Sequence, residues 1–266
     1  MRYHIDWETT YLYEKPVRSL HTELRLLPAA RAGQRFIGGT IALEPFAQPF
    51  PLIDAWGNRY HHVDFAGPLN RLVVSMTADV DTAEAPSPEP RLAPLLERLL
   101  LQPTPRSPQD PRIDALADGL DGSPLALARA ISDRIAARCT FEVGATDVSA
   151  TALDLLDHGR GVCQDLTHLL VAAMRSRGVP ARYVSGYLGL TDGEVVSEAS
   201  HAWVQVLDGD TWYGIDPANN CDQDGRYIVT AIGRDYDDVP PMRGGFHGGA
   251  SQEWSTRVSL RTQAEQ

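Results

Sequence analysis

The stretch that decides the fold is residues 201–216, which read HAWVQVLDGDTWYGID. Two strand-like runs flank Asp208-Gly209, a dipeptide that is typical of two-residue β-hairpin turns. If these two residues form the turn, counting outward along both strands places His201 directly opposite Asp216. Directly opposed residues share one face of a hairpin, with Cβ atoms about 4.5–5.5 Å apart. The register therefore predicts a carboxylate that orients an imidazole and stabilises its charged form.

A cysteine at a predicted helix start supplies a third reactive group. Cys163 follows the glycine-containing segment 159–161, and from it apolar residues recur on one helical face until Gly178 and Pro180 end the helix. Free N–H groups and the dipole at a helix start favour the thiolate, which is the nucleophilic form of cysteine. A backbone N–H there can also donate to an oxyanion. A lone cysteine is more often a small buried side chain, and the register of the hairpin is what favours chemistry here.

Three short motifs in this order resemble the transglutaminase-like superfamily. They are GVCQD at residues 161–165, SHAWV at 200–204 and DPANN at 216–220, and segments 182–187 and 233–239 support them. The resemblance covers nearly the whole chain. It is to a bacterial branch of cysteine-protease-like members with a β-rich N-terminal region. It implies an α+β, papain-like core in which the helix that carries the nucleophile packs on an antiparallel sheet.

The resemblance implies a catalytic triad of Cys163, His201 and Asp216. In such a triad Cys163 attacks an amide or ester carbonyl, His201 protonates the leaving amine, and Asp216 holds His201. We expect hydrolysis of a peptide or protein amide through a thioester acyl-enzyme, because water needs no dedicated acceptor site. Transamidation to an amine acceptor and a catalytically inactive binding module are the alternatives that the sequence leaves open.

Three further side chains are weaker candidates for substrate contact: Gln164, Trp203 and Tyr187. Gln164 follows the nucleophile, but it equally suits a helix surface. The two aromatic residues equally suit the protein core. For an amine acceptor, the three aspartates within residues 235–238 are candidates, because their charge attracts a cation.

A change of sequence period divides the chain into three parts. Residues 1–82 hold short strand-like runs and predict a small β-sandwich-like N-terminal domain. Residues 83–112 contain eight prolines, which predict a surface connector with at most a short helix. Residues 113–266 alternate helical and strand-like patterns and predict the transglutaminase-like catalytic core. Within this core we expect residues 240–249, which are rich in glycine and proline, to be a loop.

Composition argues against several classes of partner and cofactor. The net charge is -11, with no basic run, which argues against a nucleic-acid partner. Three cysteines without a CxxC pair argue against a disulfide framework, and no ligand spacing predicts a metal or another cofactor. The start of the chain lacks the apolar core of a signal peptide, and no apolar run is long enough to cross a bilayer. We therefore expect a cytoplasmic protein without a membrane partner; the oligomeric state is not indicated.

Overall fold

The computed structural model describes residues 1–85, 89, 91–248 and 251–263. Its strands are β1 (Arg2–Leu24), β2 (Gln34–Glu44), β3 (Phe50–Ile53), β4 (Arg59–Thr82), β5 (Thr140–Phe141), β6 (Arg160–Gly161), β7 (Ala181–Leu188), β8 (Glu194–Ser197), β9 (His201–Asp208), β10 (Thr211–Asp216), β11 (Cys221–Asp222), β12 (Tyr227–Gly233), β13 (Met242–His247) and β14 (Gln252–Gln263). Its helices are α1 (Pro94–Leu99), α2 (Pro111–Asp114), α3 (Pro124–Ala136), α4 (Ala152–His158) and α5 (Cys163–Ser176), with 3-10 turns at Ala115–Ala117 and Tyr236–Asp238.

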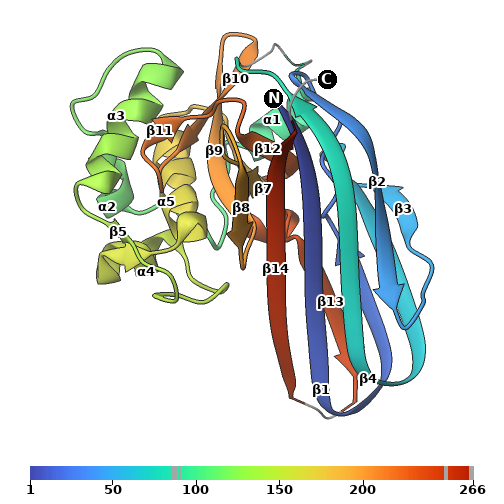
Figure 1. The fold of residues 1–266 in the computed structure, drawn as a ribbon. Coiled ribbons are helices and arrows are strands. Elements are labelled where there is room, and N and C mark those ends of the chain that lie inside the picture. The colour runs from blue at the N-terminus through green and yellow to red at the C-terminus, as the bar shows by residue number, and fades with distance from the viewer. Residues whose placement is uncertain (86–88, 90, 249–250, 264–266) are drawn as a thin grey trace.

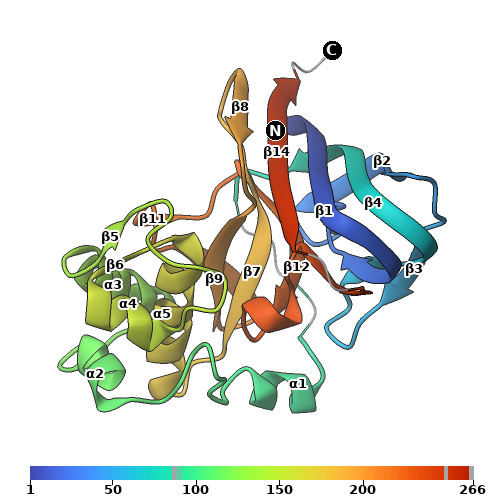
Figure 2. The same ribbon diagram turned by 90° about the horizontal axis from the view of Figure 1, so that it is seen from below.

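The predicted β-rich N-terminal region is present as a seven-stranded antiparallel sheet. Its order is β2-β4-β1-β14-β8, with β13 also paired to β1 and β3 to β4. Along β1 the alternating residues Tyr3, Ile5 and Trp7 are buried, as the period of two predicts. Hydrogen bonding joins the long strands into one continuous, strongly bent sheet, and side chains from both halves of β1 and of β4 share one apolar core (Figures 1 and 2).

One reason for the single sheet is that β4 is continuous. It runs through Gly67-Pro68, a dipeptide that usually interrupts a strand. The structure accommodates this dipeptide in an irregularity of the β1–β4 ladder, where the pairing shifts register around Val17. A bulge leaves a residue unpaired, so it tolerates a proline that cannot donate to the ladder.

The last two strands of the chain, β13 and β14, belong to the N-terminal sheet and not to the unit in which they were expected. Residues 113–266 are expected to form one unit, yet β14 pairs with β1 along its first half and β13 pairs with the second half. The expectation of a loop at 240–249 is wrong for Met242–His247, which forms strand β13. Position 249 lies outside the described residues. Gly244 explains the close pairing, because a Cβ there would lie 2.3 Å from the His21 carbonyl oxygen.

A test of this arrangement is the substitution Leu260→Ala in β14. Leu260 is buried and pairs with Ile5 of β1. We expect the free energy of unfolding, from urea denaturation, to fall by about 2–5 kcal/mol, as for other buried leucines. Ser255→Ala, at an exposed position of the same strand, serves as the control. If Leu260→Ala behaves like this control, β14 is not part of the core.

The second unit is an α+β core, which confirms the fold class. Its five-stranded antiparallel sheet has the order β11-β10-β9-β7-β12, and α5 packs on it together with α3 and α4 (Figure 2). Helix α3 begins with the Ser123 side chain accepting from a backbone N–H and Pro124 at the first helical position. In the proline-rich segment the short helix α1 is present, while Pro86, Pro88 and Pro90 lie outside the described residues. No helix in the described part of the chain is long and apolar enough to span a membrane.

Candidate active site

The β9–β10 hairpin brings His201 and Asp216 together, although not by the predicted register. The ladder pairs Asp208 with Thr211, so the turn residues are Gly209 and the aspartate after it, not Asp208 and Gly209. Gly209 has φ +62°, which suits a turn that needs glycine at its first central position. Continued along the strands, this register sets Asp216 opposite the residue two positions after His201.

The expectation of direct opposition is therefore wrong, but the predicted contact is present. A shift of two residues leaves side chains on the same face, because successive side chains of a strand alternate between faces. Diagonal neighbours on one face are within reach of long side chains. The His201 Nε2 atom lies 2.7 Å from the Asp216 Oδ2 atom, in hydrogen-bonding geometry.

Asp216 is a fully buried carboxylate surrounded by donors. Its Oδ1 atom accepts from the backbone N–H groups of Ala218 (2.8 Å) and Asn219 (3.1 Å). Its Oδ2 atom accepts from the Asn219 amide (2.7 Å) and the Tyr227 hydroxyl (2.8 Å), besides facing His201. Burial acts to raise the pKa of Asp216, but these hydrogen bonds, that of His201 first, outweigh burial and lower it. The carboxylate is thus held as an anion beside the imidazole.

The imidazole of His201 lies between this carboxylate and the thiol of Cys163. Burial favours the neutral ring, but hydrogen bonds to Asp216 and Cys163 outweigh it and raise the pKa of His201 to about 10. Because Nε2 is engaged by Asp216, Nδ1 is the ring nitrogen left for the thiol. The structure therefore brings Cys163, His201 and Asp216 together, and the raised pKa of His201 favours the charged ring at neutral pH.

The charged imidazole makes stability depend on pH. The pKa of His201 rises on folding from 6.5 to about 10, so the native state holds the extra proton. This contribution is fully present below pH 6.5 and is lost as the pH rises through about 10. Between these values, we expect the difference in unfolding free energy between wild type and His201→Gln to shrink by up to about 1.4 kcal/mol per pH unit. Urea denaturation across this window measures it, and a difference that does not vary with pH would contradict a charged His201.

Local contacts fix the start of the helix that carries Cys163. The carboxylate of Asp165 accepts from the Val162 N–H at 2.9 Å and from the Thr146 hydroxyl at 2.5 Å. A Cβ on Gly161 would lie 2.6 Å from the same carboxylate, so only glycine leaves room for it. Asp165 therefore has the structural role that its place in the first turn favours. Helix α5 begins at Cys163, whose N–H has no intrahelical partner.

A tyrosine outside the three sequence motifs packs against the same small cluster as Cys163. Cys163 and Tyr236 both pack against a small cluster that includes Tyr183. The backbone N–H of Tyr236 donates to His168 Nε2 at 3.2 Å, and burial lowers the pKa of His168 to about 3, which keeps that ring a neutral acceptor. The sequence signal for Tyr236 is its place in the supporting segment 233–239.

The three weaker candidates for substrate contact are engaged inside the protein. Trp203 is fully buried, and its Nε1–H donates to the Gln223 side chain at 2.9 Å. Tyr187 is 2% exposed, and its hydroxyl donates to a backbone carbonyl of the N-terminal unit at 2.8 Å. Gln164 is 8% exposed, and its amide donates to the Val148 carbonyl at 3.1 Å. All three side chains are thus buried and hydrogen-bonded within the protein.

The three aspartates within residues 235–238 are also partnered. Asp237 forms an ion pair with Arg106 at 2.9 Å, and Asp238 forms one with Arg234 at 2.8 Å. The Asp235 carboxylate is buried and accepts from the N–H of residue 237. The expected attraction of an amine to free carboxylates is therefore not supported here.

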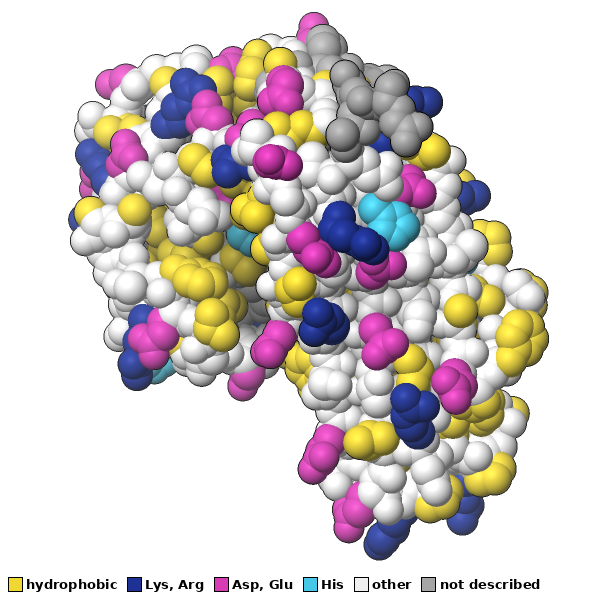
Figure 3. All heavy atoms as spheres, in the orientation of Figure 1, with side chains coloured by type: hydrophobic (Ala, Val, Ile, Leu, Met, Phe, Trp, Pro, Cys, Tyr) yellow, Lys and Arg dark blue, Asp and Glu magenta, His cyan; other side chains and the backbone are white. Residues whose placement is uncertain are grey.

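Exposed apolar surface lies beside the nucleophile. Pairing of β5 with β6 and the amide of Gln164 hold the loop after β5 next to the start of α5. This loop region exposes Phe141 (47%), Val143 (82%) and Val148 (58%). Figure 3 shows a hollow between the helical part of the molecule and the long sheet, in which hydrophobic side chains gather. Within the described residues, no group of three or more His, Cys, Asp or Glu side chains is arranged to hold a metal ion.

Comparison with known proteins places the chain in a family. Residues 114–217 match the transglutaminase-like superfamily, and residues 3–81 match the bacterial transglutaminase-like N-terminal region. The chain is also 30% identical over 274 residues to an uncharacterized protein of Mycobacterium leprae, a match that covers 97% of this chain and 98% of that protein. The chain belongs to the transglutaminase-like superfamily.

Further comparisons extend this assignment. A second relative, an uncharacterized protein of Mycobacterium tuberculosis H37Rv, is 30% identical over 272 residues, which cover 91% of this chain and 87% of that protein. The crystal structure of a "Putative Cysteine Protease" from Cytophaga hutchinsonii superposes with a TM-score of 0.79 at 20% identity, covering 100% of this chain and 92% of that one. At this identity the likeness concerns the fold alone, and it confirms the transglutaminase-like fold.

Proposed function

We propose that this transglutaminase-like protein is a thiol hydrolase that cleaves amide bonds of peptides or proteins. The observation that carries the proposal is the position of the His201 ring, which lies 2.7 Å from the buried Asp216 carboxylate and is also hydrogen-bonded to the Cys163 thiol. An imidazolium next to a thiol at a helix start favours the thiolate, which is the attacking form. All three cysteines are free, and a reducing cytoplasm would keep Cys163 from forming a disulfide.

The first half of the proposed reaction forms a thioester. The Cys163 sulfur attacks the carbonyl carbon, and the free N–H at the start of α5 donates to the developing oxyanion. His201 then gives its Nδ1 proton to the leaving nitrogen, and the C–N bond breaks. Asp216 stays ionised and keeps the ring oriented throughout. The amine leaves, and the acyl group remains on sulfur.

The second half consumes water. The neutral His201 accepts a proton from water as it attacks the thioester, and the carboxylic acid and the Cys163 thiolate are released. Transamidation needs an acceptor site that attracts an amine, and the acidic side chains nearest in sequence are already paired with arginines. Exposed Phe141 and Val148 beside the nucleophile favour an acyl group with an apolar side chain.

Product masses distinguish the possible reactions. The protein is incubated with a peptide library that includes apolar residues at each position, with and without glycinamide as acceptor amine. The proposal predicts products that gain one water, in both conditions, and none with Cys163→Ala. Products that carry glycinamide in place of water would make transamidation the activity. If neither product forms and peptides bind to the protein without reacting, the chain acts as a binding module.

A further inference from the structure

The Asp216 carboxylate receives one hydrogen bond from a distant strand. Tyr227 begins β12, which is separated from the β10 strand of Asp216 by two other strands. Its hydroxyl nevertheless donates to Asp216 Oδ2 at 2.8 Å, and this is the oxygen that faces His201 Nε2. Asn219 lies only three residues after Asp216, so the contact between these two side chains belongs to the local turn. Tyr227 instead ties the triad to the opposite edge of the sheet.

Packing on several sides fixes the phenol ring of Tyr227. The ring packs edge to face on Trp203, with centroids 5.2 Å apart, and lies 6.0 Å from the His201 ring. Gly186 permits this approach, because a Cβ there would lie 2.0 Å from the Ile228 carbonyl oxygen and 2.7 Å from the Trp203 ring. Tyr227 is 2% exposed, and besides Asp216 its hydroxyl lies within hydrogen-bonding distance of the Cys221 sulfur, at 3.3 Å.

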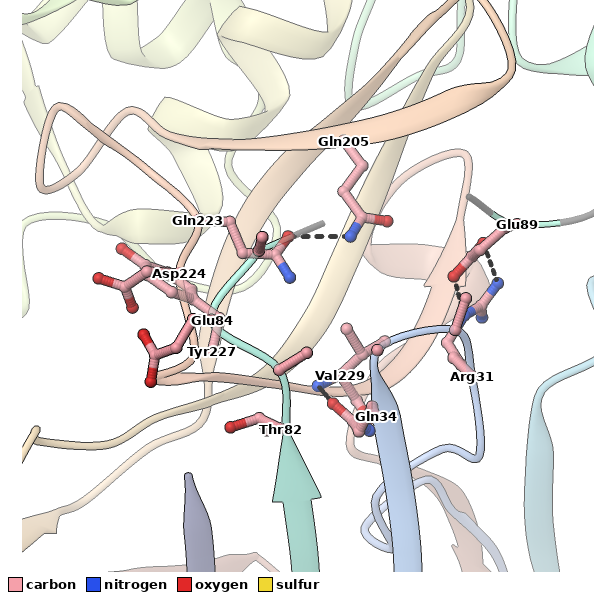
Figure 4. Close-up of a pocket in the computed structure, with 14 residues that line it drawn as sticks. Arg31, Gln34, Thr82, Glu84, Glu89, Gln205, Gln223, Asp224, Tyr227 and Val229 are labelled. Atoms are coloured by element: carbon pink, nitrogen blue, oxygen red, sulfur yellow. Dashed lines mark hydrogen bonds and ion pairs between the residues drawn. The ribbon is translucent and has the colours of Figure 1, made fainter. Parts of the chain in front are cut away.

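Two hydrogen-bonded glutamines lie near Tyr227 and fix the indole on which it packs. Figure 4 shows Tyr227 with Gln223 and Gln205 around a small pocket. The pocket measures about 40 Å³. The Gln223 carbonyl accepts from both Trp203 Nε1 and Gln205 Nε2 at 2.9 Å, which holds the indole under the phenol ring.

We infer that Tyr227 is a positioning residue for the proposed reaction: its hydroxyl holds the Asp216 carboxylate, as an anion, in the orientation that pairs with His201. The inference rests on the proposed function. A buried carboxylate has no bulk water to solvate it, so each donor contributes to keeping it charged. Without the hydroxyl, Asp216 takes up a proton at a higher pH, and His201 loses its counter-charge earlier on acidification.

The test compares Tyr227→Phe with Tyr187→Phe. Both tyrosines are 2% exposed and donate one hydrogen bond to a protein oxygen, but the Tyr187 hydroxyl bonds the Leu26 carbonyl, away from the triad. For Tyr227→Phe we expect kcat to fall about tenfold with KM unchanged. The acid limb of the pH profile for Cys163 alkylation by iodoacetamide should move up by about one pH unit. Tyr187→Phe should leave kcat and the acid limb as in wild type.

A second substitution keeps the test decisive if Tyr227→Phe does not fold. Incorporation of 3-fluorotyrosine at position 227 keeps the ring and makes the hydroxyl a stronger donor, so the acid limb should move to lower pH. If Tyr227 has only a structural role, neither variant moves the acid limb, or Tyr227→Phe and Tyr187→Phe change kcat by the same factor. Either result overturns the inference. The alkylation profile requires no substrate, so an absence of turnover would reject the proposed function without deciding the role of Tyr227.

Discussion

Cys163→Ala is expected to abolish turnover of any peptide that wild type cleaves, with a loss in kcat of at least about 10⁴-fold. The substitution removes the only atom that can form the thioester, while the start of α5 keeps its contacts through Asp165. Because Cys163 is half-buried and loses one sulfur atom, the variant should fold. Steady-state cleavage of the best library peptide measures the effect.

Cys221→Ala is the matched control for this prediction. Cys221 is also a free, half-buried cysteine, and its sulfur contacts the Tyr227 hydroxyl at 3.3 Å rather than His201. We expect this variant to cleave at a rate close to that of wild type. Residual cleavage by Cys163→Ala within tenfold of wild type would exclude a thioester at Cys163.

Asp216→Asn should lower kcat by about 10⁴-fold, a smaller loss than that of Cys163→Ala. The position of Oδ1 faces two backbone N–H groups that cannot reverse, so an amide must place its oxygen there and its NH₂ group at the Oδ2 position. This NH₂ group then donates to His201 Nε2, which forces the ring into the neutral form with its proton on Nδ1. The ring can no longer take the thiol proton, and the ion pair with Cys163 is lost.

Cleavage kinetics and circular dichroism together check this prediction. The spectrum should match that of wild type, and alkylation of Cys163 should slow in parallel with cleavage. Asp222→Asn is the control, because Asp222 lies on the neighbouring β11 and is exposed in an ion pair with Arg129. If Asp216→Asn and Asp222→Asn have equal activity, the buried carboxylate does not orient His201.

The hairpin illustrates how far the sequence predicts the site. The dipeptide at 208–209 identifies the turn. Glycine, however, is accepted at either central position of a two-residue turn, so the sequence allows two registers that differ by two residues. Because that error is an even number, His201 and Asp216 remain on one face and within hydrogen-bond distance. An error of one residue would have separated them.

Contacts between distant segments are the part that the sequence does not predict. The pairing of β14 with β1 joins the two ends of the described chain, and strand propensity does not identify a strand's partner. Trp203 and Tyr187 have the residue type of a substrate wall, but their hydrogen-bond acceptors come from other segments and bury them. Tyr227 reaches Asp216 from a strand at the other edge of the sheet, and no local pattern indicates it.

The central claim is that Cys163 is an activated nucleophile paired with His201. Its most direct test is brief alkylation with iodoacetamide at neutral pH, followed by peptide mass mapping of all three cysteines in wild type and in His201→Ala. Cys221 is the informative comparison, because it is half-buried like Cys163, whereas burial raises the pKa of the Cys139 thiol. The account predicts that Cys163 is modified first, and that His201→Ala slows alkylation of Cys163 alone. Equal rates at Cys163 and Cys221, or a Cys163 rate unchanged by His201→Ala, would contradict it.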